Sequence, residues 1–122
     1  MAHVLVVDDD ASVRAAIARS LSAAGHEVTQ AETGLEALNL VGTRPFTVAL
    51  VDLYMPQMDG LELIPKLLIQ VPGLKIVAIS GGLYGGKGID LLRAAERVGA
   101  VKSLTKPFDL DELRDVVAEL SG

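Results

Sequence analysis

The stretch from residue 47 to residue 60, which reads TVALVDLYMPQMDG, constrains the fold of this chain more than any other. Its apolar run ends in one carboxylate, Asp52, and Pro56 follows shortly after. A short continuous apolar run is typical of a strand buried on both faces of a sheet, and proline cannot continue a central ladder. Asp52 is therefore predicted at the carboxyl end of a buried strand, the edge of an open parallel sheet where ligands bind. Taken alone, the same residue could be a solvated carboxylate in a turn.

Similar apolar runs alternate along the chain with segments whose apolar residues recur at helical spacing. The predicted strands are residues 3–7, 27–31, 46–51, 75–79 and 101–104. The predicted helices are residues 13–24, 34–41, 61–71, 89–98 and 110–120, the first of them capped by Ser12 or by an acidic residue beside it. Such alternation implies parallel strands with right-handed crossovers. We therefore expect an α/β, flavodoxin-like (βα)5 fold, a doubly wound five-stranded parallel sheet in the order 2-1-3-4-5.

The length and composition narrow the classes of function. The 122 residues suit one domain, so we expect a single domain over residues 1–122 with no output domain. The net charge of −5 argues against direct binding to nucleic acid, which requires clustered Lys and Arg. No cysteine is present, so thiolate chemistry and disulfides are excluded. No apolar run is long enough for membrane insertion, and we expect a cytoplasmic protein.

The predicted topology gathers polar residues at one edge of the sheet. The first strand ends in Asp8, Asp9 and Asp10, the third in Asp52, the fourth in Ser80 and the fifth in Lys106. Because the carboxyl ends of parallel strands share one edge, these side chains are expected to lie together. Individually, Ser80 could satisfy a strand end and Lys106 could be a solvated surface residue.

The chemistry of this group indicates a cation and a phosphoryl group. Carboxylates this close repel one another, so they need protons or a cation. Mg²⁺ prefers oxygen ligands and uses one or two carboxylates together with water and a substrate phosphate. A carboxylate can act as a nucleophile and form an acyl phosphate, while Lys106 and Ser80 can contact the phosphoryl oxygens.

Four motifs in the expected order carry a resemblance that spans essentially the whole chain. They are VVDDD at residues 6–10, DLYMPQMDG at 52–60, ISGG at 79–82 and TKPFD at 105–109. Together they resemble the receiver domain of bacterial two-component response regulators, of the stand-alone kind found in chemotaxis regulators.

The resemblance implies roles for individual residues. Asp52 matches the phosphoacceptor. Asp8 and Asp9 match the acidic pair that holds Mg²⁺ (or Mn²⁺ as a substitute) together with Asp52, and the main-chain carbonyl of Tyr54 matches a further ligand.

Ser80 matches the switch Ser/Thr, and Lys106 matches the lysine that contacts the phosphoryl group. Pro107 stands where the family often has a cis peptide bond, a geometry found almost only before proline.

The resemblance also implies a mechanism in phosphorelay signal transduction. A histidine kinase or a histidine phosphotransfer protein presents a phosphohistidine, and the receiver catalyses transfer to Asp52 as well as its own dephosphorylation. It is thus a signalling switch rather than an enzyme. Movement of Ser80 and Lys106 then shifts the face formed by helix 4, strand 5 and helix 5, for an unknown downstream protein target or for onward phosphotransfer.

Two features depart from the family pattern. Ser103 stands where the family commonly has Tyr or Phe, so the aromatic half of the switch is missing. The segment 81–88 contains five glycines, and because glycine permits many backbone conformations, we expect this loop and the start of the next helix to be mobile without phosphate.

Three other functions were weighed against the receiver. A pseudo-receiver that never takes phosphate is favoured by Ser103 but opposed by the five retained site residues. An aspartate-nucleophile phosphohydrolase would carry a DxD motif after the first strand, whereas the predicted nucleophile here follows the third. A flavin-binding domain would need a phosphate loop after the first strand, where the acidic cluster would repel a phosphate.

Overall fold

The computed structural model describes residues 2–81 and 87–121, with the backbone alone at 87–89. Its five strands are β1 (His3–Val7), β2 (Glu27–Ala31), β3 (Val48–Asp52), β4 (Lys75–Gly81) and β5 (Lys102–Lys106). All pairings are parallel and the order is β2-β1-β3-β4-β5. The predicted fold class and strand order are confirmed.

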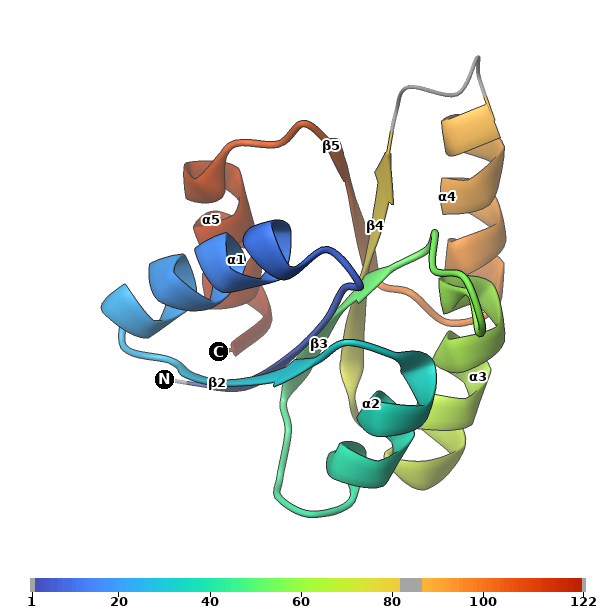
Figure 1. Cartoon of the computed structure of the whole chain (residues 1–122). Helices are drawn as coiled ribbons and strands as arrows, with labels where there is room; N and C mark the ends of the chain where they lie inside the picture. The colour runs from blue at the N-terminus through green and yellow to red at the C-terminus, as the bar shows by residue number, and fades with distance from the viewer. Residues whose placement is uncertain (1, 82–86, 122) are drawn as a thin grey trace.

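The helices are α1 (Ala11–Ala23), α2 (Gly34–Val41), α3 (Gly60–Gln70), α4 (Lys87–Arg97) and α5 (Leu110–Ser121). Helices α1 and α5 cover one face of the sheet, and α2, α3 and α4 cover the other (Figure 1). None of the helices in the described part of the chain has the length and apolar character needed to cross a bilayer.

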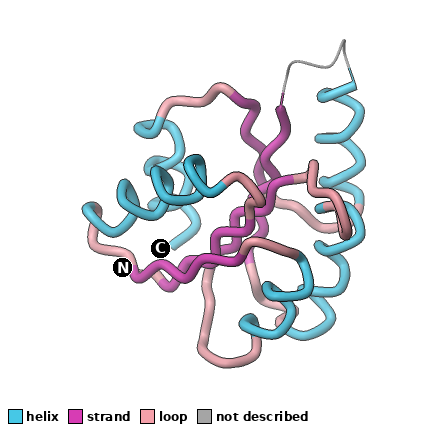
Figure 2. Tube along the Cα trace, in the orientation of Figure 1, coloured by secondary structure: helices cyan, strands magenta, loops and turns pink. Residues whose placement is uncertain are grey.

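The alternation of side chains along β3 divides the core into two layers. Val48 and Leu50 pack against the helices α1 and α5, while Ala49 and Val51 pack on the opposite side, and all four are fully buried. Apolar residues on both faces of a central strand are what burial between two helical layers requires. The continuous apolar run before Asp52 is thus explained by the position of β3 in the middle of the sheet (Figure 2).

The structure shifts three of the predicted strand limits toward the carboxyl edge. Strand β3 begins two residues later than predicted and includes Asp52, β4 continues through Ser80, and β5 continues to Lys106. The extension of β4 and β5 is mutual, because Ser80 pairs with Thr105 and Gly81 pairs with Lys106. Residues expected just after the strands are therefore held in the ladder itself.

Local capping settles where the first helix begins and ends. The carboxylate of Asp10, rather than the Ser12 side chain, caps α1 by accepting the backbone N–H groups of Ser12 and Val13. The helix ends before Gly25, whose φ of 95° is a left-handed conformation that favours glycine. The glycine-rich segment expected to be mobile lies, for residues 82–86, outside the described residues.

Candidate functional site

Two of the predicted metal-binding aspartates are buried at the ends of adjacent strands. Asp8 follows β1 and is 1% exposed, and Asp52 ends β3 and is 4% exposed. Asp9 is exposed to solvent. One carboxylate oxygen from each of the three residues lies within 4.8 Å of the others. The structure therefore brings together the three carboxylates that the sequence placed at this edge.

Lys106 reaches this cluster from the end of β5. Its Nζ lies 3.2 Å from Oδ2 of Asp8 and 3.5 Å from Oδ2 of Asp52. Burial disfavours the ammonium, but the two carboxylates outweigh that effect and raise the pKa of Lys106. The lysine is therefore cationic and bridges two carboxylates whose positions lie far from it in the sequence.

One ammonium does not fully offset the repulsion between the carboxylates. Burial, together with the charge of Asp8, raises the pKa of Asp52 from 3.8 to about 6, although the Tyr54 amide and Lys106 act in the opposite direction. The Tyr54 N–H donates to Oδ1 of Asp52 over 3.0 Å. Because ionisation of Asp52 costs free energy in this position, a further positive charge nearby would stabilise its carboxylate.

The loop after β3 is held close to its own strand by Gly60. The Gly60 N–H donates to the carbonyl of Leu53, and a Cβ at this position would lie 2.8 Å from the Asp52 carbonyl oxygen. Because only glycine allows this approach, the loop that carries Tyr54 turns back directly above the end of β3. Gly60, the last residue of the motif at residues 52–60, is thus required by close packing against the end of β3.

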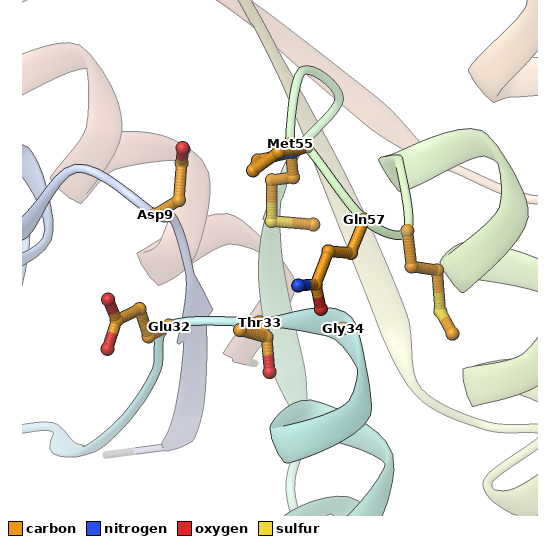
Figure 3. A pocket seen from close by; sticks show the side chains of 8 residues that line it. Asp9, Glu32, Thr33, Gly34, Met55 and Gln57 are labelled. Carbon is orange, nitrogen blue, oxygen red and sulfur yellow. The ribbon is translucent and has the colours of Figure 1, made fainter.

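A hollow of about 220 Å³ lies beside the acidic cluster, with Asp9 on its rim. Asp9 and Glu32 lie on one side of it, and Met55 and Gln57 face them from the loop after β3 (Figure 3). Asp9 therefore meets both solvent and the buried pair Asp8 and Asp52. A hydrated cation can approach the cluster from this side.

The remaining predicted residues fall as follows. Ser80 is buried at 1% exposure in β4, next to β3 and β5. Ser103 is half-buried in β5, where it pairs with Ala78. The Lys106–Pro107 peptide bond is cis. Position 103 carries a small hydroxyl side chain where the resemblance would imply an aromatic one.

Two further residues contact Asp8, one from the acidic run itself and one from the first helix. Asp10 had no assigned role, yet its N–H donates to Oδ1 of Asp8 over 2.9 Å, in addition to its capping of α1. Arg14 donates from Nη1 to the main-chain carbonyl of Asp8 over 2.7 Å. A signal for Arg14 exists in the spacing, because helical side chains tilt toward the amino terminus and cover the preceding turn.

The donor set fits a hard divalent cation. It offers carboxylate oxygens only, from two buried residues and one exposed residue, and it carries an unbalanced negative charge. Mg²⁺ binds through one or two carboxylates and keeps several waters, which the open side at Asp9 allows. No thiolate or imidazole belongs to the group, so the softer metals that prefer those ligands are not favoured.

Comparison with known proteins gives consistent matches along the chain. Residues 4–118 match the response regulator receiver domain family. The chain is 30% identical to sporulation initiation phosphotransferase F of Bacillus subtilis, over 93% of this chain and 89% of that protein. It is 34% identical to the response regulator receiver protein CpdR of Brucella abortus, over 98% of this chain and 94% of that one.

The fold comparison agrees. The chemotaxis protein CheY4 of Vibrio cholerae superposes with a TM-score of 0.87 at 31% identity, covering 98% of both chains. Some matched relatives are longer, and the chain spans 22% of the DNA-binding transcriptional regulator NtrC of Escherichia coli.

Proposed function

The chain belongs to the response regulator receiver domain family, whose members act in phosphorelay signalling, and on that premise we propose that Asp52 is its phosphoacceptor. The donor is a phosphohistidine on a histidine kinase or a histidine phosphotransfer protein. The single observation that carries the proposal is the buried cluster of Asp8, Asp52 and Lys106 at the carboxyl edge, with Asp9 beside it.

Asp52 is suited to act as the nucleophile. With a pKa of about 6, its carboxyl is mainly ionised at pH 7. A carboxylate oxygen attacks phosphorus, an O–P bond forms, the N–P bond to the donor breaks, and the imidazole leaves with the electron pair and takes a proton. Burial of Asp52 keeps bulk water away from the carboxylate, which favours transfer over side reactions.

Asp8, Asp9 and Asp52 would hold Mg²⁺, with the main-chain carbonyl of Tyr54 as a further ligand. When bound, the cation supplies neutralisation of the phosphoryl oxygens and of the carboxylates. The three carboxylates lie close together, and the exposed Asp9 leaves this site accessible to solvent. Mn²⁺ would substitute, since it accepts the same oxygen ligands.

Lys106 and Ser80 would respond to the new group. The Lys106 ammonium already lies 3.5 Å from Asp52, so a phosphoryl oxygen added there gives it a stronger partner. Ser80 stands on the adjacent strand and donates its hydroxyl to a second oxygen. The receiver thereby catalyses its own phosphorylation and, with water as the acceptor, its own dephosphorylation.

The output face comprises α4, β5 and α5. A charge change at Asp52 pulls Lys106 at the end of β5, and a shift there alters a surface that a downstream protein target reads. Ser103 has a small hydroxyl side chain and cannot provide the aromatic rotamer change of many family members.

The test is intact mass spectrometry after incubation with acetyl phosphate and MgCl₂. We expect a gain of one phosphoryl group in the wild type, loss of the gain with EDTA, and no gain in Asp52→Asn. Asp115→Asn, an exposed aspartate on α5, is the matched control and should behave as the wild type.

If neither acetyl phosphate nor the phosphoryl analogue beryllium fluoride changes the wild type, the chain is a pseudo-receiver on this fold. A gain that persists in Asp52→Asn would place the phosphoacceptor elsewhere.

A further inference from the structure

The main chain of Asp8 is held by two hydrogen bonds that leave its carboxylate untouched. Its N–H donates to the carbonyl of Ala31 in β2 over 3.2 Å, and its carbonyl accepts Nη1 of Arg14 over 2.7 Å. The carboxylate oxygens have other partners, Asp10 on Oδ1 and Lys106 on Oδ2. When a cation binds the Asp8 carboxylate, the contacts of Asp10 and Lys106 with its oxygens must lengthen or be shared with the cation. The two hydrogen bonds to the Asp8 main chain can remain unchanged.

The carbonyl that accepts Arg14 belongs to the peptide unit between Asp8 and Asp9. That unit is planar, so fixing its oxygen also fixes the direction in which the chain leaves toward Asp9. The Cα atoms of both residues lie in the same plane, so its orientation constrains the points from which the two side chains start. One donor from α1 therefore constrains the backbone that carries two of the three carboxylates in the cluster.

Arg14 is itself oriented by the neighbouring strand. Its Nε donates to Oε1 of Gln30 in β2 over 3.2 Å, while Nη1 reaches Asp8. A planar guanidinium with two such bonds has little freedom, whereas a lysine ammonium could not reproduce both directions. The first turns of α1 lie directly after the end of β1 (Figure 1), so the contact bridges α1, β1 and β2.

We propose that Arg14 is a positioning residue for the magnesium site, acting through the peptide unit between Asp8 and Asp9 and oriented by Gln30. The inference rests on the proposed function, because it requires that the aspartate cluster binds Mg²⁺. Groups that orient metal ligands without touching the metal commonly change affinity by 10-fold or more when removed. Arg14 is thus part of the support of the site, and its role is separate from its positive charge.

Removing Arg14 should change the affinity for Mg²⁺ in opposite directions, depending on whether its positioning of Asp8 or its charge matters. The direction of the change therefore distinguishes the two roles. Removing a cation beside an acidic cluster strengthens the binding of Mg²⁺ if charge alone matters. Removing the support of two ligands weakens it. Arg14→Gln keeps a long polar side chain of similar helix propensity and removes the fixed donor together with the charge.

The experiment is a titration of the full chain with MgCl₂ at constant ionic strength, followed by NMR through the Asp10 amide, which donates to Asp8. We expect the Kd of Arg14→Gln to rise about 10-fold over the wild type. Arg14→Lys, which keeps the charge, should also show a raised Kd, and Gln30→Met should show a smaller rise of about 2- to 3-fold, because the bond to Asp8 remains. Arg19→Gln removes an exposed charge from the same helix and should change the Kd by less than about 2-fold.

Each outcome decides the matter. If the wild type binds Mg²⁺ and Arg14→Gln binds it equally or more tightly, Arg14 acts only as a charge or as a structural residue, and the inference is wrong. The same holds if the Tm of Arg14→Gln falls while its Kd stays unchanged. If the wild type does not bind Mg²⁺ at all, the proposed function fails first and this inference fails with it. Rescue by Arg14→Lys to the wild-type Kd would show that any donor to the Asp8 carbonyl suffices, and the orientation of the guanidinium by Gln30 would then have no role.

Discussion

The two ends of the sheet treat charge in opposite ways. At the amino end, His3 pairs with Glu27 over 3.0 Å at the surface, and Lys75 donates to the carbonyl of Leu120 over 2.8 Å. At the carboxyl end, Asp8 and Asp52 are buried side by side and share one ammonium. These two side chains at the amino end each have an acceptor, a carboxylate or a carbonyl, whereas the carboxyl end keeps two like charges together in a buried position.

The contrast between the two ends indicates that the carboxyl end of the sheet lowers the free energy of unfolding in order to hold a reactive carboxylate. Burying an ionised carboxyl beside another costs free energy that a paired surface group does not cost. The raised pKa of Asp52 expresses that cost. Substitutions at the carboxyl end should therefore have large and pH-dependent effects on stability, and those at the amino end small and simple ones.

The largest effect is expected for Asp52→Asn without Mg²⁺. The folded-state pKa of Asp52, about 6, lies above its usual 3.8, so between these values the folded protein binds more protons than the unfolded chain. Stability contributed by this group is therefore lost as the pH rises through that window. Asp52→Asn, which has no such loss, should become more stable than the wild type by up to about 3 kcal/mol at pH 7 and by little at pH 4.

Urea unfolding in EDTA at several pH values between these limits measures the difference. Asp115→Asn, on the exposed side of α5, should show no such trend. Saturating MgCl₂ at pH 7 should narrow the gap by about 1–2 kcal/mol, because the cation binds the folded wild type only. If the difference in unfolding free energy between Asp52→Asn and the wild type stays constant from pH 4 to pH 7, burial at the carboxyl end does not raise the pKa of Asp52.

Next in size is Lys106→Met, which keeps the side-chain stem and removes the only ammonium bonded to Asp8 and Asp52 among the described residues. We expect a loss of about 2 kcal/mol at pH 7, since two buried carboxylates lose their partner. The loss should shrink near pH 5, where Asp52 takes up a proton. In the Asp52→Asn background the same change should cost clearly less, which a double-mutant cycle measures.

The control for this prediction is Lys66→Met. Lys66 forms an exposed pair with Glu62 one turn away on α3, and its loss should cost less than about 0.5 kcal/mol. If the two substitutions lower the free energy of unfolding equally, the ion pairs of Lys106 with the buried carboxylates contribute no more than an exposed pair.

At the amino end, Lys75→Met should cost about 1 kcal/mol, the usual contribution of one hydrogen bond to a carbonyl. The cost should be the same at pH 5 and pH 7 and with or without MgCl₂, because no titrating group or cation is involved. Thermal or urea unfolding under the four conditions tests this, and any dependence on MgCl₂ would mean that the two ends are coupled.

The smallest effect is expected at His26, whose Nδ1 accepts the Ala2 N–H over 3.1 Å. Burial, aided by the positive chain terminus, lowers the pKa of His26 below 6.5, so the unfolded chain binds more protons in that window. Stability from this group is therefore present above pH 6.5 and lost as the pH falls through the folded-state pKa, the opposite sign to Asp52.

His26→Gln keeps an acceptor for Ala2 but cannot titrate. It should match the wild type at pH 7.5 and exceed it at pH 5.5 by less than about 0.5 kcal/mol, because His26 is only partly buried. Parallel unfolding curves at the two pH values measure it. If the wild type becomes more stable than His26→Gln at low pH, the pKa of His26 is raised in the folded protein and not lowered.

Much of the fold was predictable because its signals are local. The apolar run before Asp52, the helical spacing in α2 and the glycine that follows α1 each specify structure over a few residues. The limits of β4 and β5 were less predictable, because Ser80 and Lys106 join the ladder only by pairing with each other's strand. Of the two alternatives for the cap of α1, Ser12 or an acidic residue beside it, the structure selects Asp10, whose carboxylate accepts two backbone donors.

The sequence by itself determined the order of strands and helices, and with it the edge at which Asp8, Asp52, Ser80 and Lys106 gather. Periodicity and chain breakers suffice for that, because right-handed parallel connections leave few topologies. Only the tertiary structure decided that Asp8 and Asp52 are buried while Asp9 is exposed, that Lys106 bridges the buried pair, and that Arg14 holds the Asp8 carbonyl. Burial and Coulomb interactions act through space, and Lys106 stands 98 residues from Asp8 along the chain.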